Sequence, residues 1–323
     1  MIGGTGYLGS AAAQELTARG HEVRAIALPP VTVDSYTAPQ FPPKMELKFN
    51  NYLKLSDDEI RECFSGCEGF VFAAGIEEGI NNFNVTPLER LLLIAKECGV
   101  KHTVICGTYF SYFDRKWPHL KLSHWHPYIR SHKELEEASL SFAGDNFNVA
   151  VLEFPYIFGV QQGREPLWII LVKILRGMKW VTMFPKGGTT MITINQAAQA
   201  IAGALEKSKG SKRWPIGCYN MPWKEFLVIV HKNMGIPERL VITVPNWLIK
   251  PEINYIENIL RENGDKIGNK FHLPKFLEIQ SAQTYIDRIH GCNPLGVKDD
   301  DIESAIGESI RLSVEFLDKK INY

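Results

Sequence analysis

The sequence of 323 residues lacks an excess of charge of either sign, because 36 lysine and arginine residues balance 36 aspartate and glutamate residues. Proteins that bind nucleic acid or anionic membranes usually present an excess of basic side chains to the phosphate groups. The balance therefore argues against both kinds of partner. We expect a small molecule as the ligand.

The chain also lacks an apolar run of membrane-spanning length, a basic and apolar leader, an internal repeat and a low-complexity segment. These absences favour a cytoplasmic protein. The six cysteines do not cluster at metal-binding spacing, so we expect reduced, mostly buried thiols and no metal site. Cys63 and Cys67 are expected to share one helix face, without the second ligand pair that zinc requires. The cysteines are Cys63, Cys67, Cys98, Cys106, Cys218 and Cys292.

The first nine residues, Met-Ile-Gly-Gly-Thr-Gly-Tyr-Leu-Gly, place Gly3, Gly6 and Gly9 at G-x-x-G-x-x-G spacing before a helical pattern. Gly3 allows a sharp turn, Gly6 allows the backbone to approach a pyrophosphate, and Gly9 allows the next helix to pack closely. The N-terminus of that helix would face the anion. The pattern predicts a dinucleotide phosphate loop.

A helix over residues 10–19 and a buried strand over residues 21–28 follow the loop in the order such a site requires. The strand that should precede the loop is represented only by Met1 and Ile2, whereas a strand usually needs about five or six residues. We therefore expect the natural chain to begin further upstream.

Strands and helices alternate through the first half of the chain, which predicts an α/β fold with a Rossmann-type, doubly wound parallel sheet. A smaller C-terminal α/β part is expected to bind substrate. We expect a nucleotide-binding domain over residues 1–160 and a substrate-side cap over 161–323, with residues near 190–200 returning to the first sheet. The expected strands are 45–49, 69–74, 102–106 and 148–154, and the expected helices are 56–64, with a Ser56 and Glu59 capping box, 86–99 and 127–142. In the cap we expect helices over 166–178, 195–207, 223–234 and 299–317, with strands near 191 and 241.

The glycine loop, the strand end 72–75, the strand end 106–108, the helix with Tyr128 and the segment 152–159 occur in the order found in extended short-chain dehydrogenases/reductases. Nearly the whole chain resembles the NAD-dependent epimerase/dehydratase branch of that superfamily. The resemblance implies NAD or NADP as cofactor. It implies cofactor contacts from Gly3, Thr5, Gly6, Tyr7, Leu8, Gly9, Leu28, Asn51, Ala73, Ala74, Gly75, Pro155 and Tyr156.

The same resemblance implies a catalytic hydroxyl after the fifth strand, for which Thr108 is the first candidate and Ser111 the second. It also implies that Tyr128 exchanges a proton with the substrate, as the tyrosine of the family's Tyr-x-x-x-Lys motif does. Here His132 stands four residues after Tyr128, and Lys133 lies one position further, about 100° around the helix. A protonated His132, or a helix bulge that returns Lys133, would be needed to supply the missing cation. The alternative is that Tyr128 is a packed aromatic.

The residues that select between the two cofactors are also missing. Relatives that prefer NAD place an acid at the end of the second strand, and those that prefer NADP place an arginine there. This chain has Ala27-Leu28-Pro29-Pro30 instead. Asn51 stands where many relatives have an aspartate that meets adenine.

Residues 117–128 gather three histidines and two tryptophans, His119, His124, His126, Trp117 and Trp125, in a segment expected to be a loop beside the substrate. Stacking on a small polar ligand is favoured there over metal binding, and simple loop packing is the alternative. The connection 75–86 is short for a region that borders the active site in relatives.

The sequence thus predicts an NAD(P)-binding oxidoreductase or epimerase/dehydratase that acts by hydride transfer on a small polar or sugar-nucleotide substrate. The alternative is a cofactor-binding sensor without turnover, motivated by His132. RNA binding is disfavoured by the charge balance. The substrate, the choice between NAD and NADP and a homodimeric state stay open.

Overall fold

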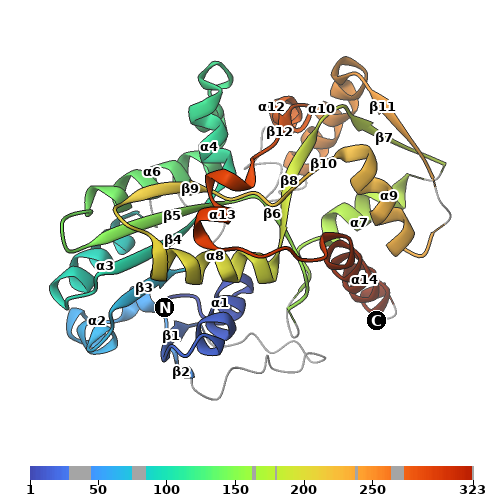
Figure 1. The fold of residues 1–323 in the computed structure, drawn as a ribbon. Coiled ribbons are helices and arrows are strands. Elements are labelled where there is room, and N and C mark those ends of the chain that lie inside the picture. Colours follow the sequence, from blue (N-terminus) through green and yellow to red (C-terminus); the bar gives the residue numbers. More distant parts are fainter. Residues whose placement is uncertain are drawn as a thin grey trace.

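The computed structural model describes residues 1–28, 45–74, 85–161, 165–178, 180–236, 239–262 and 273–321. Its first part is built on a parallel sheet (Figure 1). Ile2 bridges to Ile26 and to Phe72, and so lies between β1 and β3 and joins them into one sheet. The order is therefore β2-β1-Ile2-β3-β4-β5-β9. The strands are β1 (Val23–Ala27), β2 (Met45–Phe49), β3 (Gly69–Phe72), β4 (His102–Thr108), β5 (Asn148–Phe154) and β9 (Lys212–Pro215).

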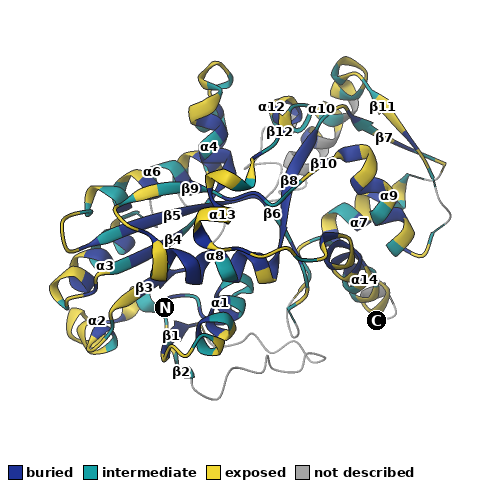
Figure 2. Cartoon of the chain, in the orientation of Figure 1, coloured by how far each residue is buried: buried dark blue, intermediate teal, exposed yellow. Residues whose placement is uncertain are grey.

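Helices cover both faces of this sheet, which explains why its central strands are apolar at successive positions. Phe70 and Phe72 contribute to the core on one face, whereas Val71 contributes to the core on the other. One face carries α2 (Asp57–Phe64), α3 (Val85–Glu97) and α6 (Pro127–Ser141); the other carries α1 (Tyr7–Ala18) and α8 (Ile194–Lys207), which pack on each other (Figure 1). The expected fold class is confirmed. Figure 2 shows the buried strands between exposed outer helix faces.

The second part contains two smaller sheets. In one, β8 (Gly188–Thr193) pairs with β6 (Tyr156–Phe158), β10 (Tyr219–Pro222) and β12 (Gln283–Thr284); in the other, β7 (Val181–Pro185) pairs with β11 (Leu240–Val244). The helices of this part are α7 (Ile169–Gly177), α9 (Trp223–Asn233), α10 (Asn246–Glu262), α12 (Leu273–Gln280), α13 (Cys292–Leu295) and α14 (Ile302–Ile321). A separate apolar core includes Phe158, Phe226 and Ile306.

The region expected to return to the first sheet is divided between the two parts. Residues 188–193 form β8 of a smaller sheet, while α8 lies on the first sheet and β9 joins its edge next to β5. The boundary at residue 160 stays a prediction. The expected capping box is confirmed, because Ser56 and Glu59 bond reciprocally at the start of α2.

Three expectations were wrong. The segment after β4 is helical rather than a loop: it contains α4 (Tyr109–Lys116), the 3-10 turn η2 (Pro118–Leu120) and α5 (Leu122–Trp125). Two further 3-10 turns lie elsewhere in the chain, η1 (Tyr52–Lys54) and η3 (Arg288–His290). Cys67 lies beyond α2, because Gly66 adopts a φ of 74° and ends the helix, so the helix face shared with Cys63 does not form. Five of the six thiols are partly exposed, and only Cys292 is buried.

Within the described ranges, no helix is both long enough and apolar enough to cross a membrane. In the same ranges, no three histidine, cysteine, aspartate or glutamate side chains gather as a metal-binding group.

Candidate active site

The three glycines of the loop are required by close backbone contacts. Gly3 has a φ of 83°, and a Cβ there would lie 2.8 Å from backbone atoms of Ala73 and Ala74. A Cβ on Gly9 would lie 2.1 Å from the carbonyl oxygen of Gly3. The loop is therefore folded tightly between the end of β3 and the start of α1, as the spacing predicted.

The start of α1 is arranged to receive an anion. Gly6 occupies the N-cap position and has no side chain to bond the first-turn amides. The amides of Tyr7, Leu8 and Gly9 have no acceptor within the helix, and the helix dipole favours negative charge at this end. A Cβ on Gly6 would also lie 3.1 Å from the Gly3 oxygen, in the same tight turn. These residues fit the pyrophosphate of a dinucleotide.

Sequence reasoning missed the residues that hold this loop from the other side. The Gln161 amide nitrogen donates to the carbonyl oxygen of Thr5 at 2.9 Å, and the Tyr7 hydroxyl donates to the carbonyl oxygen of Gly159 at 3.1 Å. The amide of Gly159 donates to the hydroxyl of Ser309 on α14 at 2.7 Å. The glycine loop is thus fixed to the end of β6 and to α14. No local sequence signal connects residues so far apart.

The other predicted cofactor residues lie at the ends of strands. Ala73 and Ala74 follow β3, and the Ala73 amide donates to the Ile2 oxygen at 3.0 Å. Leu28 follows β1 and is 47% exposed. Asn51 follows β2 and accepts from the Leu53 amide at 3.0 Å. Gly75 lies outside the described residues.

The two remaining cofactor candidates follow β5. Pro155 is buried, and the Tyr156 hydroxyl accepts from the amide of Gln280 at 2.8 Å. Because the carboxyl ends of the parallel strands form one edge, all of these positions border the same side of the sheet as the glycine loop.

The structure brings Thr108 and Tyr128 together. Thr108 ends β4 and caps α4, its oxygen accepting from the Phe110 amide at 3.5 Å, while Tyr128 lies in the first turn of α6. Desolvation by the surrounding protein raises the pKa of the Tyr128 hydroxyl, and hydrogen bonding with Thr108 opposes this rise. The ring is 40% exposed, so water also offsets part of the rise. Tyr128 is therefore protonated at neutral pH.

Ser111, the second hydroxyl candidate, points elsewhere. It is fully buried on α4 and lies beside Glu136, whose ionised form it favours. Of the two candidates, Thr108 is the one whose hydroxyl interacts with Tyr128.

His132 lies one helical turn after Tyr128 and packs against it, with ring centroids 4.4 Å apart in an edge-to-face arrangement. The side chain is 8% exposed, and burial lowers the pKa of His132 to about 4. The imidazole is therefore neutral at neutral pH, and it does not supply the cation that the family's lysine would supply.

Lys133 is held on a different side of α6 by a buried acid. Its ammonium group lies 2.9 Å from a carboxylate oxygen of Asp114 on α4. Burial would raise the pKa of Asp114, but hydrogen bonds from Ser123 and Lys133 outweigh it and hold this pKa below its ordinary value. The ion pair between Lys133 and Asp114 therefore holds α6 against α4.

Replacing Lys133 with methionine should consequently affect stability rather than cofactor binding. The variant leaves the buried Asp114 without its cation but with its two hydrogen bonds from Ser123, and we expect about 1–2 kcal/mol of lost stability. This loss of stability is smaller than the loss expected for a fully buried ion pair, because 34% of the lysine side chain is exposed. Urea unfolding and NADPH titration measure the two effects. A tenfold loss of affinity without loss of stability would instead indicate that Lys133 contacts the cofactor.

A pair of fully buried carboxyl groups lies between α6 and the first sheet. Glu136 on α6 and Glu153 on β5 are flanked by Arg115, which lies 2.5 Å from Glu153 and 3.4 Å from Glu136. Arg213 on β9 lies 3.4 Å from Glu136. Burial, followed by the charge of Glu153, raises the pKa of Glu136 to about 8, and burial also raises that of Glu153. The cluster joins α6, α4 and the sheet.

This raised pKa predicts a specific pH dependence of stability. Between the ordinary glutamate pKa of 4.5 and about 8, the folded protein binds more protons at Glu136 than the unfolded chain does. Its contribution to stability is therefore full at low pH and falls as pH rises to about 8, by at most about 1.4 kcal/mol per pH unit. Glu136→Gln should flatten that slope in urea unfolding from pH 5 to 9. The exposed Glu137→Gln on the same helix is the control, and an equal slope in both variants would contradict the assignment.

The histidines ahead of α6 occupy helical turns rather than the expected loop. His119 lies in η2 and His124 in α5, whereas His126 precedes α6 and is 1% exposed. Burial lowers the pKa of His126 to about 4. Its ring packs near Tyr128 and Phe276, so this histidine helps to position the start of α6.

Residues 3–141 match the family of NAD(P)H-binding proteins. A search of curated proteins by sequence finds no match. Solved structures of similar fold include a nucleoside-diphosphate-sugar epimerase from Pseudomonas aeruginosa, at 14% identity and a TM-score of 0.69 over 98% of this chain and 96% of that one.

Two further structures carry bound cofactors. A UDP-glucose 4-epimerase from Stenotrophomonas maltophila with NAD and formylated UDP-arabinopyranose is 14% identical, with a TM-score of 0.65 over 99% of this chain and 98% of that one. The Citrobacter sp. triphenylmethane reductase with NADP(H) is 15% identical, with a TM-score of 0.59 over 95% and 98%. Residues 3–141 therefore form an NAD(P)H-binding domain whose cofactor is NAD or NADP, and the chain shares the Rossmann-type fold of these solved structures.

Proposed function

We propose that this protein is an NAD(P)H-dependent oxidoreductase that reduces a carbonyl group of a small polar substrate, including those of the sugar-nucleotide type. The observation that carries the proposal is the pairing of Thr108 with Tyr128. Both hydroxyls lie at the carboxyl edge of the parallel sheet, where the glycine loop also lies.

The protonation state of Tyr128 favours reduction over oxidation. A dinucleotide held by the glycine loop would supply the hydride for the carbonyl carbon. Tyr128, whose pKa is not lowered from its ordinary value of 10, keeps its proton at neutral pH and would donate it to the carbonyl oxygen, which gives an alcohol. Thr108 orients the same oxygen through its hydroxyl. The reverse reaction needs a phenolate, and neither His132 nor Lys133 is placed as a cation that would stabilise one.

The second candidate is a cofactor-binding sensor without turnover. It is favoured by the neutral state of His132 and by the ion pair of Lys133 with Asp114, because the family's chemistry uses a lysine beside the tyrosine. Under this candidate Tyr128 is a packing partner of His132.

One experiment separates the two candidates. The full chain is incubated with NADH or NADPH deuterated at C4 and a panel of aldehydes, ketones and UDP-keto-sugars, and products are analysed by mass spectrometry. Deuterium in an alcohol product supports the reductase. Saturable quenching of tryptophan fluorescence by a dinucleotide without deuterium transfer supports the sensor. Absence of binding to all four dinucleotides contradicts both.

A further inference from the structure

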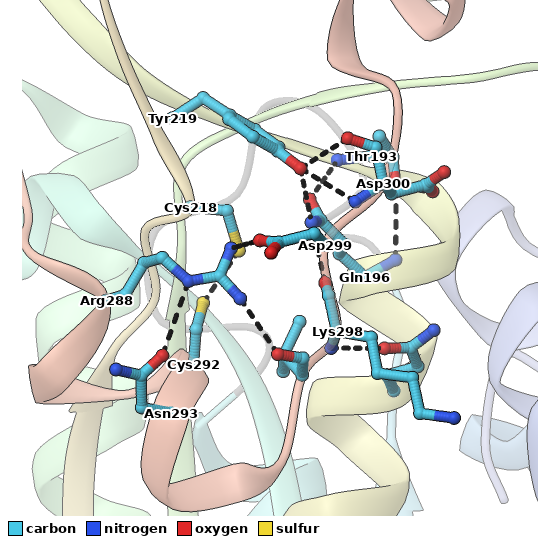
Figure 3. A network of polar contacts seen from close by, with 12 residues as sticks. Thr193, Gln196, Cys218, Tyr219, Arg288, Cys292, Asn293, Lys298, Asp299 and Asp300 are labelled. Carbon is cyan, nitrogen blue, oxygen red and sulfur yellow. Dashed lines mark hydrogen bonds and ion pairs between the residues drawn. The ribbon is translucent and has the colours of Figure 1, made fainter.

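Two cysteines that are 74 residues apart in sequence meet at the junction of the two parts of the chain. The sulfur of Cys218, just before β10, lies 2.9 Å from the sulfur of Cys292, at the start of α13 (Figure 3). A disulfide bond is about 2.05 Å long, so a small rotation of the side chains would bring the two sulfur atoms to bonding distance.

A fixed cation lies beside the two thiols. The guanidinium group of Arg288 donates to the side chain of Asn293 at 3.3 Å and to the carbonyl oxygen of Val297 at 2.9 Å (Figure 3). It also pairs with Asp299 at 3.0 Å. Three partners thus hold the guanidinium group in one position, and its positive charge lowers the pKa of both thiols, whereas the negative charge of Asp299 raises that of Cys218.

The two thiols have unequal acidity. A hydrogen bond from Cys218 lowers the pKa of Cys292, burial opposes it, and the Gly217 amide and Arg288 lower it further. The same hydrogen bond, together with burial, raises the pKa of Cys218. The pair therefore holds its proton on Cys218 and its thiolate character on Cys292, which suits a reaction in which one sulfur attacks the other.

The pair is reachable by a small oxidant. Cys218 is partly exposed, whereas Cys292 is fully enclosed. Cys218 is therefore the sulfur that an oxidant meets first, and Cys292 is in place behind it.

We propose that Cys218 and Cys292 are an oxidation site at which a peroxide closes an intramolecular disulfide. The shared proton first passes from Cys218 to Cys292 along their hydrogen bond, and the Cys218 thiolate attacks hydrogen peroxide, breaks the O–O bond and becomes a sulfenic acid. The released hydroxide takes the proton of Cys292 and leaves as water. The Cys292 thiolate then attacks the sulfenic sulfur, forms the disulfide and expels hydroxide. Two electrons pass from the thiols to the peroxide. This site does not depend on the reaction at Tyr128.

The disulfide would join both ends of a long segment of the second part. Residues 219–291 include α9, β11, α10, α12 and β12, and both ends lie against the first part through α13 and α8. The neighbouring Tyr219 hydroxyl binds the backbone of Asp300, whose carboxylate accepts from Thr193 at 2.6 Å (Figure 3). Closing so long a loop restricts the unfolded chain, so the oxidised protein should melt about 5–10 °C higher.

Peptide mapping of the full chain tests the proposal without any variant. The protein is treated with one equivalent of hydrogen peroxide, unfolded, alkylated at free thiols and digested with trypsin. Cleavage leaves Cys218 in peptide 214–224 and Cys292 in peptide 289–298. We expect these two peptides to be linked and the free thiols to fall from six to four. Dithiothreitol should restore all six.

Variants provide the matched control. Cys218→Ser should remove both the linked peptides and the rise in melting temperature, whereas Cys98→Ser, also partly exposed, should keep both. Substitution at Cys218 disturbs the fold less than substitution at the enclosed Cys292. The proposal is overturned if peroxide oxidises other thiols first, if it takes Cys218 to sulfinic acid with Cys292 still free, or if Cys218→Ser keeps the temperature shift.

Discussion

Gly9→Ala is expected to weaken dinucleotide binding by about 100-fold or more. The added methyl group would lie 2.1 Å from the Gly3 oxygen, so the loop must move away from α1. Overpacking of this kind costs about 1–3 kcal/mol or more, and about 2.8 kcal/mol is a factor of 100 in affinity. Titration of NADH and NADPH, followed by quenching of tryptophan fluorescence, measures the loss.

Two further glycines separate a binding defect from a folding defect. Gly6→Ala places a methyl group 3.1 Å from the same oxygen, a milder contact, and should keep the fold while it reduces affinity. Gly177→Ala in α7 meets no atom within 4 Å and should bind as the wild type does. Circular dichroism verifies the fold of each. Wild-type affinity in Gly6→Ala and Gly9→Ala would show that the loop is not the phosphate site.

Tyr128→Phe is expected to lower the rate of carbonyl reduction by about 10²- to 10⁴-fold, the usual contribution of a positioned proton donor. The ring is kept, so its packing on His132 and the affinity for the dinucleotide should change little. Single-turnover oxidation of NADPH measures the chemical step.

Because the pKa of Tyr128 is raised above its ordinary value of 10, the wild-type rate should stay constant through neutral pH and fall only in strongly alkaline solution.

The control for this variant is Tyr255→Phe on α10, where the side chain is 66% exposed. It should keep the wild-type rate. Reduction at the wild-type rate by Tyr128→Phe would remove Tyr128 from the mechanism, and cofactor binding without reduction in the wild type would favour the sensor.

Much of the fold follows from local pattern. β2 and β5 begin and end at the predicted residues. β2 alternates apolar and charged side chains, as a half-buried strand does, and β5 is buried along nearly its whole length, as a central parallel strand is. The tight turn of the glycine loop could likewise be predicted from the sequence, since glycine is the residue that fits both the positive φ of Gly3 and the close contact at Gly9. The short helix α4 was missed. Its one signal, Thr108 as the N-cap, was interpreted as a catalytic hydroxyl, and its aromatic residues have only modest helix propensity.

The sequence by itself determined the alternation of strands and long helices in the first part and the glycine loop, because spacing and hydrophobic periodicity are local properties. Thr108 and Tyr128 were candidates only through the family resemblance, and their contact is a property of the tertiary structure. Only the tertiary structure decided which groups are charged and which meet. Burial makes His132 neutral, and Asp114 binds Lys133. Cys218 and Cys292, far apart in sequence, meet because the chain returns to α8 after the second part has folded.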